Sequence, residues 1–231
     1  MAVVTISREY GSGGDQVAAR LCEILGYHSF GKAQIEKAAE DTTMSRLNAV
    51  DYSEDNHEVQ SFLKRVFGRS ASPVQNIAWM ENPSIASQAK RADVHEIAVI
   101  SLVKRAIKAA LVENRMVIVG RGGQVLLKDQ PGVLHVRIEA PLENRTQRVM
   151  EQLKRENKEN LPAGDLMRAA DELIATRDIA SADYIRRYYN VNWADPRLYH
   201  MVLNLGLLSV EQATQIIATG VSELEPQAAA S

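Results

Sequence analysis

Apolar and polar residues alternate along the chain in a way that predicts strands separated by helices. Residues 3–7 are short, β-branched and apolar, which is typical of a buried strand. A glycine-rich stretch, residues 11–14, follows, and behind it apolar residues return at helical spacing: Val17, Ala18, Leu21 and Leu25. Gly26 stands where helices commonly end in a left-handed glycine. This opening therefore predicts a strand, a glycine loop and a helix.

The same alternation continues through the second half of the chain. Apolar residues three or four apart predict a long helix over 87–114, and an uninterrupted apolar run predicts a central strand at 116–120. We also expect strands at 134–140 and 198–203, and helices from 141, over 165–182 and from 209. Residues 27–31 are expected to form a short connection. Strands that alternate with helices predict a parallel sheet with helices on both faces.

Residues 41–87 break this pattern, because their periodicity is poorer and their polar content is higher. They still carry too many large apolar side chains for a disordered linker: Phe62, Val66, Phe67, Ile77, Trp79 and Met80. We expect short helices and loops outside the sheet, with these side chains packed on the body of the protein. A homodimer surface is the second interpretation.

Composition narrows the class of protein. At 231 residues the chain can bury a full core, as one domain or as a domain with a helical insertion. Its net charge of −2 gives no overall field for nucleic acid or a membrane surface, and no apolar run is long enough to cross a bilayer. The single cysteine, Cys22, excludes an internal disulfide and fits a reducing compartment. Because the N-terminus enters a strand directly and carries no signal peptide, we expect a cytoplasmic α/β protein.

The glycine loop is the first candidate site, and it consists of Gly11, Ser12, Gly13 and Gly14. A strand, a glycine loop and a helix together point backbone N–H groups at a phosphate, and glycines remove the Cβ atoms that would block a close anion. The usual P-loop rule fails here, since Gly14 stands in place of the lysine and Asp15 in place of the hydroxyl. Arg8 is the nearest cation that can substitute. An ordinary turn without a ligand fits these residues equally well.

Four arginines are further candidates for binding an anion. Arg121 lies among glycines directly after the strand predicted at 116–120, at the edge where ligands of open α/β sheets bind. It can fork onto a phosphate or carboxylate there, or pair with a structural acidic residue. Arg177, Arg186 and Arg187 lie in a helical region, and basic groups on a closing helix neutralise charge in phosphoryl transfer. A solvated helix face is an equally good interpretation for Arg186 and Arg187. The five histidines lack metal-ligand spacing, so the metal ligands stay unidentified.

These stretches, in this order, resemble the cytidylate kinase-like family, the P-loop nucleoside monophosphate kinases related to cytidylate kinase. The resemblance is carried by SREYGSGG, VIVGRGG, HVRIEAPLENR and the RD and YIRRYY segments, within residues 1–40 and 88–219. It implies a P-loop NTPase-type parallel sheet with helices on both faces, a helical substrate-binding insertion and a helical lid. The implied boundaries are 1–40 and 88–222 for the kinase core, about 160–197 for the lid, 41–87 for the insertion and 223–231 for a flexible tail.

The resemblance also implies an activity, the transfer of the ATP γ-phosphoryl, with Mg²⁺, to CMP or dCMP. It implies that the glycine loop holds the donor phosphates and that Arg121 contacts the phosphate of the acceptor. Arg177 matches the first arginine of the lid. Lys37 falls where cytidylate kinases carry an acceptor-binding arginine, so it keeps the charge but loses the fork.

Several positions depart from the expected motifs: Gly14, Asp15, Gly31, Gly122, Ala180 and Ser181. Each departure removes charge where such an active site would use it, or adds a carboxylate beside the phosphate loop. We therefore keep two main hypotheses, a nucleoside monophosphate kinase and a degenerate kinase-like protein that binds nucleotide with little transfer. A third is an interaction protein that self-associates through the acidic and then basic segment at 51–69.

Overall fold

The computed structural model describes residues 2–30, 100–156 and 162–224. The predicted insertion at 41–87 lies outside these residues, together with Lys37, Gly31 and the tail beyond residue 224. Within the described ranges, no helix has the length and apolar character needed to cross a membrane.

In the described residues, five parallel strands form one sheet in the order β2-β3-β1-β4-β5. The strands are β1 (Val3–Arg8), β2 (His28–Ser29), β3 (Met116–Val119), β4 (Val133–Glu139) and β5 (Met201–Asn204). β1 is central, since its Val3 pairs with Met116 on one side and with Val133 on the other. Continuous apolar runs form these inner strands because helices cover both of their faces. The predicted parallel sheet is confirmed.

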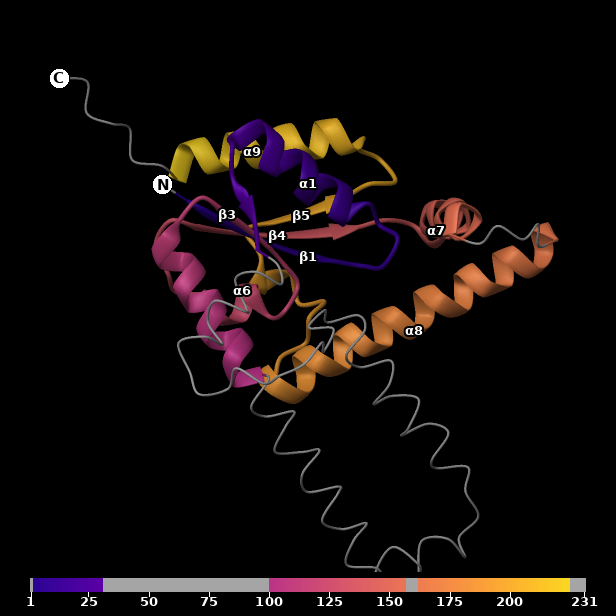
Figure 1. Ribbon diagram of the computed structural model, residues 1–231, viewed down its shortest axis with the longest axis horizontal. Helices are drawn as coiled ribbons and strands as arrows, with labels where there is room; N and C mark the ends of the chain where they lie inside the picture. The colour runs from indigo at the N-terminus through magenta and orange to yellow at the C-terminus, as the bar shows by residue number, and fades with distance from the viewer. Residues whose placement is uncertain (1, 31–99, 157–161, 225–231) are drawn as a thin grey trace, which may run out of the picture.

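Helices lie on both faces of the sheet (Figure 1). On one face, α1 (Gly14–Leu25) and α9 (Val210–Leu224) bury a cluster that includes Ile6, Val136 and Ile217. On the other face, the helix at residues 100–113 and α6 (Gly123–Leu126) cover a second cluster around Met116 and Ile118. The sheet therefore has a separate apolar core on each side.

Two helix ends form as their sequences predict. Gly26 takes the left-handed conformation, with φ of 64°, and the Tyr27 N–H bonds the Cys22 carbonyl at 3.0 Å. α9 begins with a reciprocal capping box, in which the Gln212 N–H donates to Ser209 Oγ at 3.1 Å and the Ser209 N–H donates to Gln212 Oε1 at 2.9 Å. Both ends satisfy backbone groups that a helix leaves unpaired.

Some elements differ from the prediction. β2 falls inside the expected connection at 27–31, and α6 was not expected, because two residues and a single turn are too short to show a period. The last strand begins at Met201 instead of 198, because Asp195 caps a short 3-10 helix, η1 (Pro196–Leu198), in front of it. α9 extends through 223 and 224, which the prediction placed in the tail.

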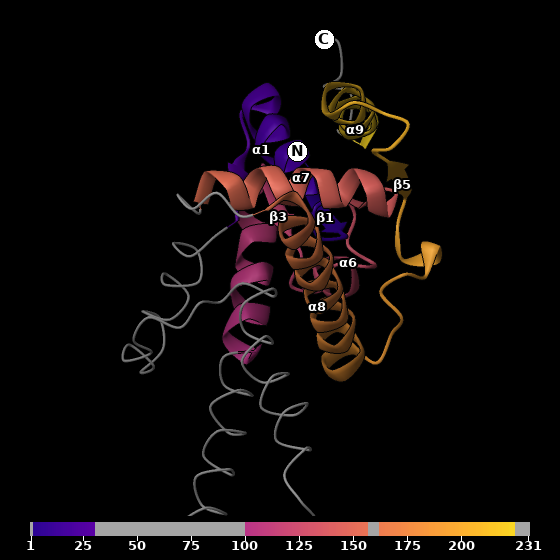
Figure 2. The ribbon, with the colours of Figure 1, turned by 90° about the vertical axis from the view of Figure 1, so that its right-hand side faces the viewer.

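α7 (Leu142–Glu156) and α8 (Ala163–Tyr189) frame the carboxyl ends of the strands (Figure 2). α8 runs past the predicted end at 182 because Tyr184 and Ile185 bury themselves against Ile100 of the helix at 100–113. Its first half packs on α7 through a cluster that contains Val149, Ala170 and Ile174. The long helix therefore spans this edge of the sheet from α7 to the helix at 100–113.

Candidate functional site

The topology places the candidate site at the carboxyl end of β1. From β1 the chain crosses through α1 on one face of the sheet to β2, beyond β3, whereas from β3 it crosses through α6 on the other face to β4, beyond β1. Such a switch in a parallel sheet opens a crevice outside the carboxyl ends of the strands, where ligands bind. The glycine loops that follow β1 and β3 both lie at this crevice.

The loop after β1 delivers the N-terminus of α1 to the crevice. Gly11 and Gly13 have φ of 75° and 93°, and Gly13 directly precedes the first residue of α1. Ser12 is buried, and its Oγ accepts a long hydrogen bond from the Gly14 N–H at 3.4 Å. A helix N-terminus that opens on such a loop presents N–H groups and a partial positive charge to an anion.

Packing of the protein, more than room for an anion, explains the glycines of this loop. A Cβ on Gly11 would lie 2.8 Å from Val149 Cγ2 of α7, and one on Gly13 would lie 2.9 Å from Leu205 Cδ2. At Gly14 a Cβ would lie 2.5 Å from Arg8 Cβ. The first side-chain carbons of Arg8 therefore occupy the space that the Cβ of a lysine at position 14 would need. This steric conflict accounts for the departure from the P-loop rule.

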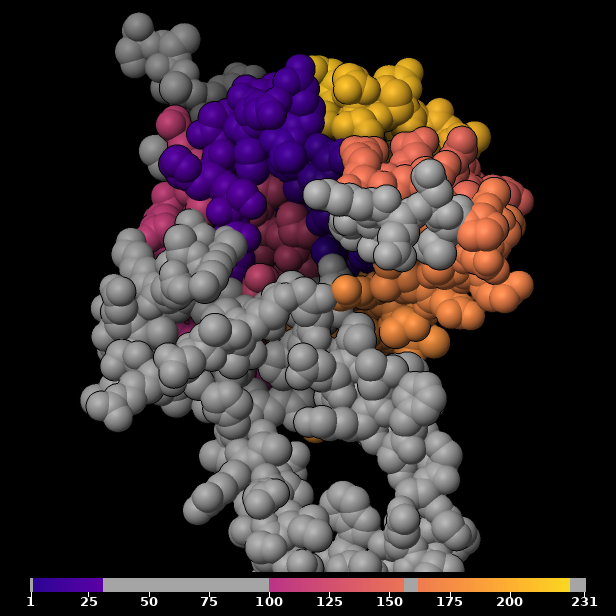
Figure 3. Space-filling view, turned by 45° about the vertical axis from the view of Figure 1, so that its right-hand side comes forward, coloured from indigo at the N-terminus to yellow at the C-terminus, as the bar shows by residue number. Residues whose placement is uncertain are grey.

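Arg8 and Asp15 form an ion pair at the mouth of the loop. Arg8 Nε lies 3.1 Å from Asp15 Oδ1, and the Arg8 side chain is 13% exposed whereas that of Asp15 is 68% exposed. Both line a cavity of about 360 Å³, together with Phe30 and Arg121. Asp15 also borders a second cavity of about 340 Å³, between the glycine loop and α7. Figure 3 shows the recessed face between α1, in indigo, and α7 and α8, in salmon and orange.

Arg121 reaches the first cavity from a strained turn. Gly120, Arg121 and Gly122 have φ of 66°, 59° and 72°, three left-handed residues in succession. The Arg121 carbonyl accepts a hydrogen bond from Tyr189 Oη at 3.0 Å, and the Arg121 guanidinium lies 5.7 Å from the centre of the Phe30 ring. A Cβ on Gly122 would collide with the Tyr189 ring, so packing against the end of α8 requires glycine there. The structure thus brings Arg8 and Arg121 to one cavity.

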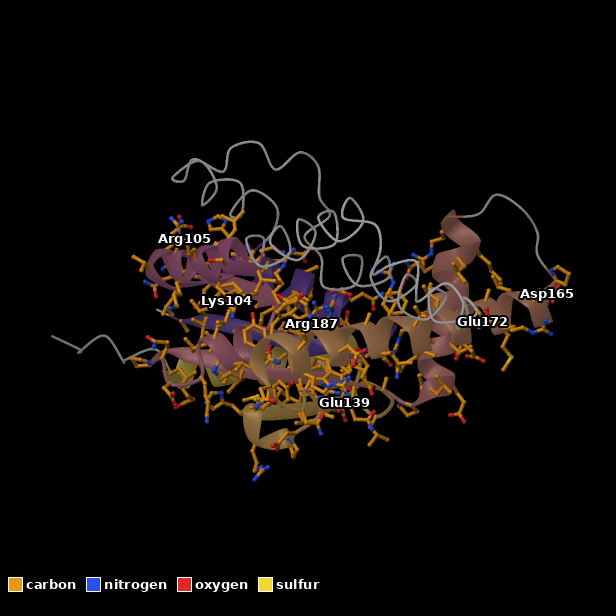
Figure 4. The ribbon with its side chains drawn as sticks, turned by 90° about the horizontal axis from the view of Figure 1, so that it is seen from below. Lys104, Arg105, Glu139, Asp165, Glu172 and Arg187 are labelled. Atoms are coloured by element: carbon orange, nitrogen blue, oxygen red, sulfur yellow. The ribbon has the colours of Figure 1, made fainter. Side chains whose placement is uncertain are left out.

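The predicted lid arginines separate into two groups. Arg177 lies over the ring of Tyr10, with its Cζ 5.6 Å from the ring centre, next to the glycine loop. Arg186, 75% exposed, pairs with Asp183, and Arg187 lies over Tyr188, both on α8 itself. Arg186 lies nine positions after Arg177 on α8, which is about 14 Å along the helix. Figure 4 shows Arg187 at the end of α8 near Lys104, far from Asp165 at the other end.

Two further positions on α8 carry small residues in place of the arginines of the expected lid motif. Ala180 and Ser181, where lid arginines were expected, are 0% and 3% exposed. They face packed protein, so an arginine at either position would have to displace its neighbours. The lack of arginine there follows from how α8 packs on the body.

Sequence reasoning missed two arginines of α7 that hold the loop. Arg148 donates to the Ser12 carbonyl and to the Leu205 carbonyl, each at 2.9 Å. Arg145 donates to the Tyr10 carbonyl at 2.8 Å and lies 3.5 Å from Glu9 Oε2. Burial raises the pKa of Glu9, a shift that its hydrogen bond from the Ala140 N–H and the charge of Arg145 oppose. The sequence feature that could have identified them is a pair of arginines three residues apart, on one face of a predicted helix.

The residues at the loop fit a phosphate-bound magnesium ion better than a fixed metal centre. In the described part of the chain, no group of three or more histidine, cysteine or acidic side chains could hold a metal. Magnesium in phosphate sites commonly needs only one or two carboxylates, because the substrate phosphates and water supply the rest. Asp15, in the first turn of α1, offers a carboxylate of that kind.

Comparison with known proteins gives a match to one family and several similar solved structures. The model of the cytidylate kinase-like family matches residues 3–206. A solved structure of an uncharacterized protein from Eubacterium ventriosum is 22% identical, with a TM-score of 0.60, and the match covers 96% of this chain and 99% of that one. Shikimate kinase from Acinetobacter baumannii, solved with shikimate, is 14% identical with a TM-score of 0.42 and coverage of 97% and 95%. A gluconokinase from Sinorhizobium meliloti is 12% identical with a TM-score of 0.42 and coverage of 96% and 93%. No curated protein matches.

Proposed function

The chain belongs to the cytidylate kinase-like family, and we propose that it is a nucleoside monophosphate kinase that transfers the γ-phosphoryl of ATP to CMP or dCMP. One observation carries the proposal. Arg8 and Arg121 line a single cavity beside the N-terminus of α1 and the glycine loop. This arrangement offers cationic groups to two phosphates at once, as a reaction between two nucleotides requires.

Different residues of the chain bind the donor and the acceptor nucleotide. The loop from Gly11 to Gly14 and the N-terminus of α1 bind the donor phosphates, and Arg121 binds the phosphate of the acceptor. Arg8 and Arg177 neutralise charge that develops on the phosphoryl group during transfer. Asp15 holds Mg²⁺, which supplies further positive charge when it is bound. Positioning and electrostatics, with no covalent intermediate on the protein, lower the barrier.

A degenerate kinase that binds nucleotide with little transfer is the second candidate. It is favoured by the ion pair that Asp15 makes with Arg8, because a carboxylate there competes with phosphate for the same guanidinium. The position of Arg186 and Arg187 at the packed end of α8 also removes two cations from the loop in this conformation. Missing cations penalise transfer more than binding.

Calorimetry on Arg121→Ala tests the assignment of the acceptor site. Loss of a charge-assisted contact costs roughly 1.5–3 kcal/mol, so we expect the Kd for CMP to rise about tenfold to a hundredfold while the Kd for ATP changes little. Arg20→Ala is the control, since Arg20 is half exposed on α1 and pairs with Glu23 one turn away. An equal loss for both nucleotides would make Arg121 structural.

A further inference from the structure

The backbone of Tyr10, the residue that enters the glycine loop, is held from both sides by side chains of other elements. Its N–H donates to Asp178 Oδ1 of α8 at 2.9 Å, and its carbonyl accepts from Arg145 Nε of α7 at 2.8 Å. These partners lie 168 and 135 positions away along the sequence. The entrance of the loop is therefore fixed by α7 and α8, and not by local turn chemistry alone.

One buried guanidinium joins these elements. Arg145 also donates to the second carboxylate oxygen of Asp178 and lies 3.5 Å from Glu9 Oε2, which in turn accepts from the Ala140 N–H at 3.2 Å. The Arg145 side chain is buried, so its bonds form away from bulk water, where charge-assisted contacts are strongest. The planar fork of arginine suits such simultaneous contacts, whereas a lysine ammonium does not.

The same contacts set the position of α8 along the loop. Asp178 is fixed to the Tyr10 N–H and to Arg145, and the adjacent Arg177 lies over the Tyr10 ring. If α8 slid or rotated, Asp178 would leave both partners and Arg177 would leave the loop. The shape of the loop entrance and the placement of Arg177 are thus two consequences of one set of bonds.

We propose that Asp178 and Arg145 are positioning residues that lock the glycine loop and α8 to each other, so that Arg177 is at the loop whenever the loop has its binding shape. The lock is a property of the free protein. Its kinetic consequence rests on the proposed function: without the lock, nucleotide contacts remain available but their geometry is lost, so kcat falls more than the KM for ATP rises.

Substitutions at Asp178 separate the two bonds, and the same helix provides a control. Asp178→Ala removes both acceptors, whereas Asp178→Asn keeps an acceptor for the Tyr10 N–H and loses the charge that Arg145 faces. Asp183→Ala is the matched control, because Asp183 also lies on α8 and also pairs with an arginine, but at the surface. Arg145→Lys keeps the charge and loses the fork, which gives a milder second variant.

Hydrogen exchange of the full-length protein without ligand tests the lock. Peptides that contain residues 10–14 should exchange roughly tenfold to a hundredfold faster in D178A, the range expected for loss of a hydrogen bond to a charged group, and by an intermediate factor in D178N. In D183A they should exchange at the wild-type rate, and β4 peptides should be unchanged in all variants. Loop exchange in D178A equal to that in D183A would overturn the proposal. Faster exchange in β4 of D178A would mean that this variant is destabilised as a whole. In that case R145K takes its place, and loop exchange in R145K equal to that in D183A would overturn the proposal.

Steady-state kinetics then test the positioning role. With ATP, Mg²⁺ and CMP, D178A should lower kcat at least tenfold while the KM for ATP stays within about threefold, and D183A should match wild type. Faster loop exchange with an unchanged kcat would overturn the positioning role. A wild-type protein without transferase activity would refute the proposed function, and hydrogen exchange would still decide whether the lock exists.

Discussion

His135 makes the stability of the sheet depend on pH. It lies on β4, 2% exposed, where Thr5 Oγ1 hydrogen bonds its Nδ1 at 2.7 Å and the His200 ring stacks on it with centroids 5.1 Å apart. Its backbone N–H also donates to His200 Nδ1 at 2.9 Å. Burial, and secondarily the charge of His200, lower the pKa of His135 from 6.5 to about 4. Protonation of His135 is therefore unfavourable in the folded protein and ordinary in the unfolded one.

The sign and size of the effect follow from this shift. Between pH 6.5 and about 4 the unfolded state binds more protons at this residue than the folded state does, so stability is lost as pH falls through that window. At pH 5 the loss relative to pH 7.5 amounts to about 2 kcal/mol, and it approaches about 3 kcal/mol at lower pH, since each unit of pKa shift is worth roughly 1.4 kcal/mol.

Urea unfolding of wild type and His135→Asn at pH 7.5, 6 and 5 measures this effect. The asparagine amide lies near the position of Nδ1 but does not titrate, so titrating groups that do not contact His135 cancel in the comparison. We expect the variant to be less stable at pH 7.5 and the difference to shrink by about 2 kcal/mol at pH 5. Stability curves that stay parallel from pH 7.5 to 5 would refute the reasoning.

Two further substitutions test the site itself. Asp15→Asn should bind ATP about fivefold more tightly without Mg²⁺, because it removes a largely exposed negative charge worth roughly 1 kcal/mol at about 4 Å, and calorimetry should show this gain disappear when Mg²⁺ is added. Equal affinities in the absence of Mg²⁺ would contradict it. Gly122→Ala should lower the free energy of unfolding by about 2–4 kcal/mol, because its methyl meets the Tyr189 ring at positive φ, whereas the control Gly164→Ala, with nothing near the added methyl, should not destabilise. Equal unfolding midpoints for the two glycine variants would count against the packing of Tyr189.

Local sequence patterns were sufficient to predict the elements around the candidate site. Continuous apolar runs mark β1, β3 and β4, and a regular apolar face after the glycine loop marks α1. Hydrophobic periodicity and the bounding glycines therefore identify these elements. The position of Arg121 at the end of β3 was predictable for the same reason, because a parallel sheet brings its carboxyl ends together.

Contacts between distant residues were not predictable in this way. Nothing in the sequence near Tyr10 indicates that its peptide groups bind Asp178 and Arg145, since these bonds exist only once α7 and α8 have packed. The burial of Ala180 likewise depends on the side of α8 that meets the body. A motif comparison treats this position as a missing arginine, whereas the fold requires a small residue there.

The central claim, that this chain is a kinase whose Arg177 acts at the glycine loop, is tested most directly by phosphoryl transfer in wild type, Arg177→Ala and Arg186→Ala. Arg186 provides the control because it lies on the same helix but pairs with Asp183 at the surface. With ATP, Mg²⁺ and CMP or dCMP, we predict turnover by wild type, a kcat lowered roughly 10³-fold in R177A, and a kcat within about twofold of wild type in R186A. Turnover by R177A at the wild-type rate, or no turnover of either nucleotide by wild type that binds ATP, would contradict the account.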